Sequence, residues 1–582
     1  MRRTKIVCTI GPASEDLDTI KEFIQRGMDV ARLNFSHGTH LEHGERIKKI
    51  KEASRLLHKR VGILVDTRGP EIRIKAFRGG KVELQEGERF TLTTKEVDGD
   101  SRRVSITYQG LPGDVCPGTR ILLDDGLIEL RVEKITSTEI ETLVIHGGSI
   151  SSYKGINVPG VYINLPVLTA ADERDIAFAL QQDIDFIAAS FIRRAADVLT
   201  IRRLLEKNSS PVKLIAKIEN AEGVKNFHEI LQVADGIMVA RGDLGVEIPA
   251  EVVPLVQKKI IAACNRAGKP VITATQMLDS MIRHPRPTRA EASDVANAIF
   301  DGTDAVMLSG ETASGAFPVE AVETMARIAA RTEEALEYRE ILEKLKPALQ
   351  NSVTDAISYA TCRAAQDLGV AAIISATHSG HTARMVSKYK PKAPIIAVTP
   401  SAKVASALTL TWGVYPLLCP PTSTTDETFN TSVKVALEAG LIQSGDLVIL
   451  TAGVPVGVPG TTNFMRIDTV GEVIIQGQGI GKTAVTGVVH VALTPEEALD
   501  MEEGQILVSN STDKDFVPAM EKAAAIITEA GGLTSHAAIV GLSLGKPVIV
   551  GATGAARKLS TGLLVTVDAV RGLIYRGRAR VN

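Results

Sequence analysis

Eight short apolar runs, rich in Val, Ile and Ala, constrain the fold of this chain more than any other feature. Runs that are apolar without alternation suit strands buried on both faces, and a helical pattern after each run suits a parallel sheet. We therefore predict an α/β fold built on a closed (β/α)₈ TIM barrel. The runs are KIVCTI, DVARLN, VGILVD, DFIAAS, VKLIAK, DGIMVA, PVITAT and DAVMLS.

The third and fourth runs are separated by a gap several times longer than the others. Between about Ile72 and Asn164 the gap holds short alternating segments and many Gly turns, which are typical of all-β structure. We predict an inserted β-barrel over residues 71–165. It leaves after strand three and returns before strand four, beside the face where barrel active sites are built, so we expect a lid. A merely decorative insertion is the alternative.

The second half of the chain predicts two further units. Residues 318–345 have the pattern of one amphipathic helix. Helical patterns at 354–368, 381–390 and 426–439 then alternate with AAIISAT, PIIAVT and LVILTA, which indicates a small open parallel sheet. We predict four domains: the barrel over 1–70 and 166–345, the lid over 71–165, an open α/β domain over 346–470, and an extra C-terminal domain over 471–582.

Composition excludes several classes of protein. The 66 Lys and Arg residues against 68 Asp and Glu residues give a net charge of −2, which argues against nucleic-acid binding through bulk charge. No apolar run approaches the roughly 18 residues of a membrane helix. The first apolar stretch stops at Gly11-Pro12, too short for a signal peptide, and the five cysteines lack metal-site spacing. We expect a cytoplasmic protein with reduced thiols; a catalytic thiol at Cys8 or Cys264 is the alternative.

Polar residues follow nearly every apolar run. In a barrel the carboxyl ends of all strands meet at one mouth. A single such pair is readily explained as a structural salt bridge, but six strand ends sharing the pattern favour an active site. The residues are Arg32, Asn34, Ser36 and His37 after strand two; Asp66, Thr67, Arg68, Glu71 and Arg73 after strand three; Lys217, Glu219 and Asn220 after strand five; Arg241, Gly242 and Asp243 after strand six; Thr275 and Gln276 after strand seven; and Ser309, Gly310 and Glu311 after strand eight.

The kinds of side chain at this mouth indicate a reaction class. Glu219 and Asp243 are hard carboxylates without His or Cys neighbours, which suits Mg²⁺ or Mn²⁺ better than zinc. Lys217, with Arg32 and Arg73, would concentrate the positive charge that a transferring phosphoryl group needs. A further set of oxygen donors suits a weakly bound monovalent cation: Asn34, Ser36, Asp66 and Thr67. The inferred chemistry is metal-assisted phosphoryl transfer.

Eight motifs occur in order across about the first 470 residues. They are IGPAS (10–14), ARLNFSHG (31–38), DTRGPEIR (66–73), KIEN (217–220), MVARGDLGVEIP (238–249), TATQMLDSM (273–281), RPTRAEASDVANA (286–298) and LSGETA (308–313). Together they resemble the motifs of pyruvate kinases. The resemblance implies transfer of the phosphoryl group of phosphoenolpyruvate to ADP, giving pyruvate and ATP in the final step of glycolysis, by a homotetramer.

The resemblance also implies roles for these residues. Glu219 and Asp243 would hold the divalent metal, while Arg73 and Lys217 would stabilise the phosphoryl group in flight. Thr275 would lie where the enolate is protonated, by a water fed through a hydroxyl relay that includes Ser309. The substrate carboxylate would meet the chain at Ala240, Arg241, Gly242 and Asp243, near Arg32 and Thr275, and K⁺ would bind Asn34, Ser36, Asp66 and Thr67.

Glu71 adds to the potassium assignment, because family members that work without potassium tend to carry Lys at this position. The alternative is that Glu71 only pairs with a neighbouring Arg.

Contacts to ADP and to an effector are implied in the same way. Candidate nucleotide-binding residues are Pro12, Arg32, Asn34, His37, Arg73 and Lys154. The segment Thr377, His378, Ser379, Gly380, His381 and Thr382 joins a strand to a helix and matches the family's effector-phosphate loop. The later loop 452–462 lacks the Trp and Arg of relatives that bind fructose bisphosphate, so a monophosphate such as ribose 5-phosphate or AMP is expected. An ordinary capped helix is the alternative.

The extra domain carries a second resemblance. GGLTSHAAIVGLSLGKPVIVG (531–551) is similar to the phosphohistidine domain of phosphoenolpyruvate synthases and dikinases, and His536 aligns with their phosphorylated His. Val540-Gly541 replaces an Ala-Arg pair of that pattern, so we favour a structural or interaction role over phosphate carriage. QGQGIGKT (476–483) lacks the first Gly of a P-loop and is interpreted as a Gly-rich turn.

Three functions from different classes therefore compete. They are a pyruvate kinase, a phosphocarrier or dikinase acting through His536, and a non-catalytic effector-binding scaffold. The presence of every key charged residue argues against the scaffold.

Overall fold

The computed structural model describes residues 1–346, 352–454, 461–471 and 473–579. All eight apolar runs form the parallel strands of one closed barrel, as predicted. Hydrophobic side chains fill its interior, among them Val30, Leu64, Ile215, Met238 and Ile272. In barrel order the strands are β1 (Lys5–Thr9), β16 (Ala305–Leu308), β15 (Val271–Ala274), β14 (Gly236–Ala240), β13 (Lys213–Ile218), β12 (Phe186–Ala189), β3 (Gly62–Asp66) and β2 (Val30–Asn34).

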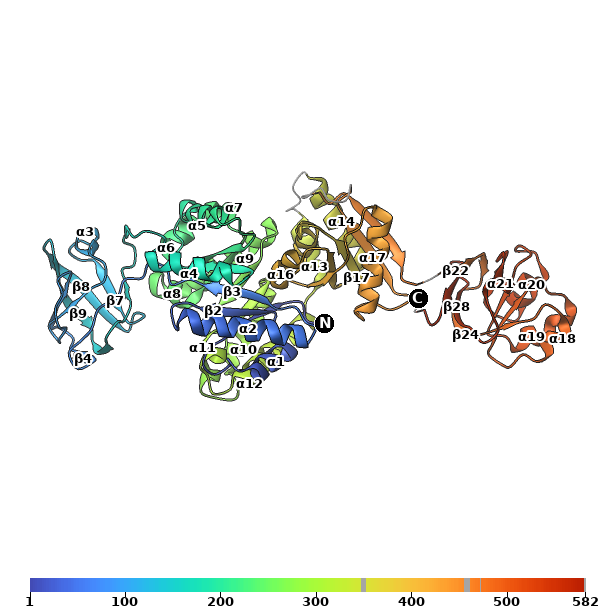
Figure 1. The fold of residues 1–582 in the computed structure, drawn as a ribbon, viewed down its shortest axis with the longest axis horizontal. Coiled ribbons are helices and arrows are strands. Elements are labelled where there is room, and N and C mark those ends of the chain that lie inside the picture. Colours follow the sequence, from blue (N-terminus) through green and yellow to red (C-terminus); the bar gives the residue numbers. More distant parts are fainter. Residues whose placement is uncertain (347–351, 455–460, 472, 580–582) are drawn as a thin grey trace. The chain divides into compact units, whose positions relative to one another are not determined.

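Helices surround this barrel (Figure 1). Several begin at capping boxes that satisfy free amides: Thr39 and Glu42 cap one helix, and Thr288 and Glu291 cap another. The helices are α1 (Leu17–Arg26), α2 (His40–Leu56), α4 (Ala170–Gln181), α5 (Ala195–Lys207), α6 (Ala221–Lys225), α7 (Phe227–Val233), α8 (Arg241–Glu247), α9 (Val253–Ala267), α10 (Arg289–Phe300), α11 (Gly310–Ala313) and α12 (Pro318–Glu334).

The single helix predicted over 318–345 is wrong. The chain forms α12 and then a separate helix α13 (Tyr338–Leu345). The break lets the Tyr338 hydroxyl donate a hydrogen bond to the Glu333 carbonyl at 3.0 Å. The Glu333 carboxylate in turn accepts the amides of Arg3 and Thr4. Amphipathic spacing continues through both helices, so the sequence pattern alone conceals the break.

The insert between β3 and β12 is an all-β unit with its own core. Six strands form one sheet in the order β11-β7-β8-β9-β5-β6, and β10 pairs with β4. Phe90, Leu92, Ile121, Leu130 and Ile140 are buried within it. The elements are β4 (Lys81–Leu84), β5 (Arg89–Thr93), β6 (Arg103–Ser105), α3 (Leu111–Asp114), β7 (Arg120–Leu123), β8 (Ile128–Ile135), β9 (Glu139–His146), β10 (Gly148–Ser151) and β11 (Ile156–Asn157).

The open α/β sheet has the order β19-β18-β17-β20-β21. The three runs predicted from sequence pair in parallel, as expected, but β21 pairs with β20 antiparallel. The elements are α14 (Val353–Leu368), β17 (Ala372–Ala376), α15 (His381–Ser387), β18 (Ile395–Thr399), α16 (Ala402–Ala407), β19 (Val414–Leu418), α17 (Thr425–Glu438), β20 (Leu447–Ala452) and β21 (Phe464–Thr469).

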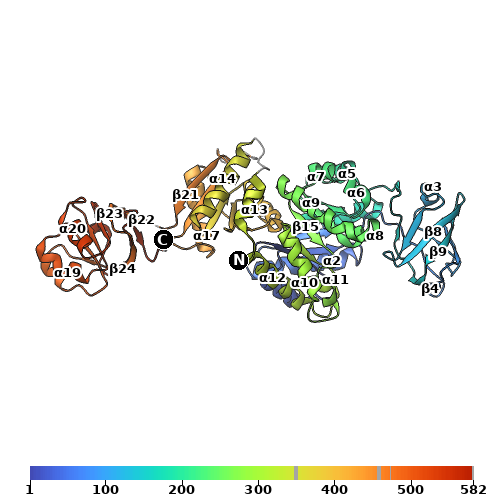
Figure 2. The same cartoon turned by 180° about the vertical axis from the view of Figure 1, so that it is seen from behind.

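The C-terminal segment forms an eight-stranded sheet with the order β22-β29-β28-β24-β25-β26-β27-β23 (Figure 2). Two apolar cores accompany it, one including Val489, Ile527 and Val567, the other including Leu507 and Ile526. The elements are β22 (Val473–Gln476), β23 (Gln478–Ile480), β24 (Ala484–Val491), α18 (Pro495–Leu499), β25 (Ile506–Ser509), α19 (Val517–Lys522), β26 (Ala525–Thr528), α20 (His536–Ser543), β27 (Val548–Val550), α21 (Ala555–Lys558), β28 (Leu564–Asp568) and β29 (Leu573–Arg576).

By its internal contacts the chain divides into two compact units. The first takes its described residues from Met1–Gln350, His378–Pro391 and Ser401–Pro416, and the second takes the remainder. Barrel and insert thus belong to one unit, and the four-domain division remains a prediction. Among the described residues, none of the helices has the length and apolar character required to cross a membrane.

Candidate active site

Lys217, at the carboxyl end of β13, is the centre of a buried charged cluster. Its ammonium nitrogen Nζ lies 3.0 Å from Asp66 Oδ1 and 2.8 Å from Glu219 Oε1, and it donates a hydrogen bond to Ser190 Oγ at 2.7 Å. Arg32 Nε binds the other Asp66 oxygen at 2.7 Å. Residues on or directly after β2, β3, β12 and β13 thus meet at one mouth, as the barrel topology requires.

The charges in this cluster stabilise one another. Burial alone would lower the pKa of Lys217, but Asp66 and Glu219 outweigh burial and hold that pKa above its ordinary value. Burial would likewise raise the pKa of Asp66, but Lys217 and Arg32 outweigh it and keep that pKa low. Lys217 is therefore a permanent cation, held where a phosphoryl group would find positive charge.

Two other carboxylates are poorly neutralised. Burial raises the pKa of Glu219 to about 7; Lys217 opposes this shift and Asp243 adds to it. Burial also raises the pKa of Asp243, and the nearby carboxylates of Asp125 and Glu71 contribute. Within the residues that the structure describes, no three His, Cys, Asp or Glu side chains gather as metal ligands. A dication here would take two carboxylates from the protein, which is the common arrangement for Mg²⁺.

Arg241 connects the loops that follow β14 and β15. Its guanidinium donates to the carbonyls of Ala274 at 3.1 Å and Thr275 at 2.7 Å, and it binds Asp294 at 2.7 Å. Gly242 N–H donates to Thr275 Oγ1 at 2.7 Å. Thr275 has a φ of 66°, a left-handed conformation that costs a non-glycine residue energy and must be held by its surroundings. The Arg241 side chain therefore holds the Thr275 backbone in this conformation.

We expect Arg241→Lys to raise the KM for the substrate on the order of tenfold with a smaller fall in kcat, because an ammonium cannot replace the planar fork that holds Thr275. Steady-state kinetics would measure both constants. Arg331→Lys is the matched control, since the Arg331 side chain is 85% exposed. An unchanged KM in Arg241→Lys would contradict the role of Arg241 in holding Thr275.

The proposed potassium ligands lie at the ends of β2 and β3. Asn34 and Asp66 are direct partners in the parallel register. Asn34 Oδ1 accepts the amide of Ser36 at 3.1 Å, and Thr67 Oγ1 accepts the amide of Ser190 at 3.3 Å. The side chains of all four supply only oxygen donors or an amide, as a hard monovalent cation requires.

The candidate nucleotide contacts fall into two groups. Pro12, Arg32, Asn34 and His37 lie on or directly after β1 and β2. Arg73 and Lys154 lie close together in the insert, where Arg73 forms an isolated antiparallel bridge with Gly155. Arg73 donates to Glu71 Oε2 at 2.6 Å and to the Tyr153 carbonyl at 2.7 Å, and Lys154 binds Asp124 at 2.8 Å. Glu71 thus forms an ion pair with Arg73. Pairing with a neighbouring Arg was the alternative to a role in potassium binding.

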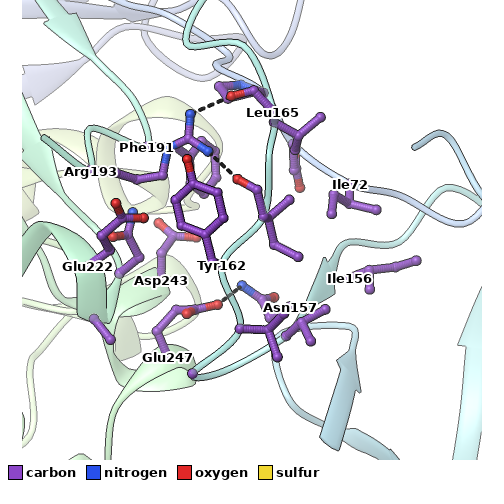
Figure 3. A pocket seen from close by; sticks show the side chains of 18 of the residues that line it. Ile72, Ile156, Asn157, Tyr162, Leu165, Phe191, Arg193, Glu222, Asp243 and Glu247 are labelled. Carbon is purple, nitrogen blue, oxygen red and sulfur yellow. Dashed lines mark hydrogen bonds between the residues drawn. The ribbon is translucent and has the colours of Figure 1, made fainter. Parts of the chain in front are cut away.

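A pocket of about 440 Å³ lies between the insert and the barrel (Figure 3). Asp243, Glu222 and Glu247 line one side, and Asn157 and Tyr162 of the insert line the other. Asn157 donates to Glu247 at 3.1 Å, and Arg193 donates to the carbonyls of Ile163 and Leu165 at 2.7 and 2.5 Å. These contacts hold the segment that leads back from the insert against the barrel.

Ser309 and Glu311 follow β16. Ser309 Oγ is buried and has no hydrogen-bond partner among the described residues. Glu311, which sequence reasoning noted without a role, accepts the amides of Ser309 at 2.7 Å and Leu278 at 3.1 Å. Glu311 therefore holds the backbone at Ser309, while the Ser309 hydroxyl keeps its hydrogen-bonding capacity unused among the described residues.

Sequence reasoning missed three residues that hold this site together. Ser190 accepts from Lys217, and Phe191 N–H donates to Glu219 Oε2 at 2.5 Å. Asp294, on α10, anchors Arg241. Ser190 ends the fourth apolar run, so the strand-end rule that found the other residues also points to it. Asp294 lies in the middle of a helix and carries no such signal.

The proposed effector loop follows β17. Thr377 N–H donates to the Val398 carbonyl at 3.0 Å, and Gly380, with a φ of 76°, precedes His381 and Thr382 at the start of α15. Arg384 Nη1 donates to the Ser379 carbonyl at 3.3 Å. The loop 452–462, whose lack of Trp and Arg predicts a monophosphate effector, lies partly outside the described residues, which omit 455–460.

The segment from β22 to β29, which is part of the second compact unit, is called the C-terminal unit. In it, His536 is the first residue of α20, and its Nδ1 lies 3.1 Å from Thr512 Oγ1. Gly541 is required by packing, because a Cβ there would lie 2.2 Å from Val548 Cγ2. Gln476 ends β22 and Gln478–Ile480 form β23, so the first part of the turn predicted over 476–483 is strand instead, interrupted at Gly477. Gly479 is needed there because a Cβ would lie 2.0 Å from the Ala569 carbonyl oxygen.

Comparison with known proteins gives matches along the chain. Family models match residues 1–322 (pyruvate kinase, barrel domain), 355–468 (pyruvate kinase, alpha/beta domain) and 501–572 (PEP-utilising enzyme, mobile domain). A pyruvate kinase of Geobacillus stearothermophilus is 57% identical over 584 residues, and one of Bacillus licheniformis is 55% identical over 585, each covering 100% of both chains. A crystal structure of a Cryptosporidium parvum pyruvate kinase matches with a TM-score of 0.77 and 41% identity, covering 80% of this chain and 96% of that one.

Proposed function

Because this chain belongs to the pyruvate kinase family and transfers the phosphoryl group of phosphoenolpyruvate to ADP, we propose that the buried cluster around Lys217 carries out that transfer. The observation that supports the assignment most strongly is a permanently charged ammonium at the carboxyl ends of the barrel strands, between Asp66 and Glu219. Fixed charge of this kind stabilises charge that develops on a transferring phosphoryl group.

The family generally uses Mg²⁺ and K⁺. We propose that Glu219 and Asp243 hold the divalent ion, since Glu219 is buried, Asp243 is partly buried, and both carboxyls have raised pKa values. When bound, this ion neutralises negative charge on the substrate oxygens. Asn34, Ser36, Asp66 and Thr67 are the proposed ligands of K⁺.

Other residues of this chain position the reactants. Backbone amides from Ala240 to Asp243 receive the substrate carboxylate, near Arg32, and Arg73 meets the phosphoryl group from the side of the insert. Thr275 Oγ1 donates its proton to the Ala274 carbonyl at 2.6 Å, so that proton is already committed. We therefore assign the hydroxyl relay that protonates the enolate to Ser309 Oγ, which has no partner among the described residues.

ADP is proposed to contact Pro12, Arg32, Asn34, His37, Arg73 and Lys154, and the insert to act as a lid. A phosphorylated monophosphate effector is proposed to bind Thr377 to Thr382 and to activate a cytoplasmic homotetramer. The C-terminal unit is proposed to have a structural or interaction role. A phosphocarrier function is the competitor, favoured by the match to the PEP-utilising mobile domain, and it would show acid-labile phosphate on His536 after incubation with phosphoenolpyruvate alone.

The test is pyruvate release from phosphoenolpyruvate and ADP with Mg²⁺, with and without K⁺, and with ribose 5-phosphate or AMP. We expect turnover to depend on K⁺ and either monophosphate to lower the phosphoenolpyruvate concentration needed for half-maximal rate. Equal turnover with and without K⁺ would remove the potassium assignment. An unchanged substrate dependence with both monophosphates would remove the effector assignment.

A further inference from the structure

A second pocket, of about 220 Å³, lies at the opposite end of the barrel from Lys217. Phe186 and Lys213, at the amino ends of β12 and β13, form part of its wall, with Pro270 before β15. Arg384 and Met385 of α15 complete the wall. All of these residues belong to the first compact unit.

The charges that face this pocket do not balance. Lys213, Lys269 and Arg384 line it together with a single carboxylate, Asp235. Arg202 already binds Asp235 at 2.8 Å, whereas Lys213 Nζ is 4.0 Å from it. Lys269 Nζ is held by backbone carbonyls, so its positive charge stays beside the pocket. The pocket is therefore cationic.

Arg384 is the side chain that most needs a partner. Its guanidinium makes one hydrogen bond, to the Ser379 carbonyl at 3.3 Å, and no ion pair in the part of the chain that the structure describes. Burial lowers its pKa, and Asp235 only partly compensates. A guanidinium has five N–H donors in a planar fork, and leaving most of them unpaired at this partly buried position is costly. An anion in the pocket would remove that cost.

The size and lining of the pocket restrict this anion. Its volume is below the 300–1,000 Å³ typical of sites for drug-sized ligands, so only a compact molecule fits. A planar guanidinium with a nearby ammonium matches the oxygens of a phosphate group. We propose that this pocket, formed by Arg384, Lys213 and Lys269, is a binding site for the phosphate group of inorganic phosphate or of a compact phosphorylated metabolite. The proposal does not depend on the catalytic assignment.

The test is titration of the full-length protein with inorganic phosphate at constant ionic strength, by isothermal calorimetry and by thermal unfolding. We expect Arg384→Met to weaken phosphate binding by about tenfold or more, because it removes a charge-assisted fork. Arg331→Met, on an exposed side chain, is the matched control and is expected to keep the wild-type affinity. Lys213→Met provides a second variant at a half-exposed position, in case Arg384→Met folds poorly.

Lys217→Met separates this pocket from the active site, which also attracts phosphate. The pocket is supported if phosphate binding persists in Lys217→Met and falls in both Arg384→Met and Lys213→Met. Loss of all binding in Lys217→Met, or unchanged binding in both pocket variants, would overturn the proposal. Titration with ribose 5-phosphate then distinguishes the sources. Because Arg384 also binds the Ser379 carbonyl of the proposed effector loop, a metabolite site in this pocket requires that the sugar phosphate compete with inorganic phosphate and lose affinity in Lys213→Met as well as in Arg384→Met.

Discussion

Lys217→Met is expected to lower kcat by about a thousandfold, since the variant loses the fixed positive charge that opposes charge on the phosphoryl group during transfer. Met keeps the length and apolar stem of Lys, so packing around β13 changes little. Measurement of kcat and of the KM for phosphoenolpyruvate under saturating ADP and Mg²⁺ would show whether the loss falls on kcat. Full turnover in this variant would contradict the role of Lys217.

Lys217→Met is also expected to lower the free energy of unfolding. Breaking a buried ion pair costs about 3–5 kcal/mol when the remaining charge has no other partner. Here Asp66 retains Arg32 at 2.7 Å, and Glu219, with a pKa already about 7, can take up a proton. We therefore expect the loss of unfolding free energy to be at or below the lower end of that range, so the variant still folds. Lys434→Met, at a 74% exposed side chain, is the control for both activity and thermal unfolding.

Glu219→Gln should lower kcat/KM by about a thousandfold and weaken binding of Mg²⁺, because an amide supplies no negative charge to a dication. The Gln side chain still accepts the Phe191 amide through its oxygen, so the local fold is preserved. Binding stabilises a folded protein, so wild-type protein should show a rise in Tm with Mg²⁺ that is much reduced in the variant. This measurement is independent of turnover.

Glu247→Gln is the matched control, because Glu247 is a partly buried carboxyl with a raised pKa and lies on α8 close to Asp243. It should retain the Mg²⁺-dependent rise in Tm. If Glu219→Gln keeps that rise and Glu247→Gln loses it, the metal assignment belongs at Glu247 and the adjoining pocket.

The barrel and much of its mouth could be predicted because both follow from repeated local rules. Strands buried on both faces must be apolar, and the topology brings the residue after each strand to one end. Lys217, Glu219, Asp66 and Arg32 meet for this reason. The rule cannot tell which cation pairs with which carboxylate, because that depends on side-chain directions inside the barrel.

Other features depend on contacts between distant segments and were missed. Asp294 acts only through Arg241, which lies 53 residues away along the chain. The division between α12 and α13 depends on Tyr338 folding back onto Glu333, and β21 adds to its sheet in the antiparallel sense. In the C-terminal unit, the glycines of 476–480 serve close backbone packing, and their spacing alone resembles a loop.

The pairing of β22 with β29 brings the first and last strands of the C-terminal unit side by side. A segment whose two ends meet can be joined to another polypeptide at either end, or spliced into a surface loop, without forcing its host apart. Its cores are formed by its own side chains. We therefore expect that this segment can be transferred to another protein, or removed from this one, while the barrel strands keep their register.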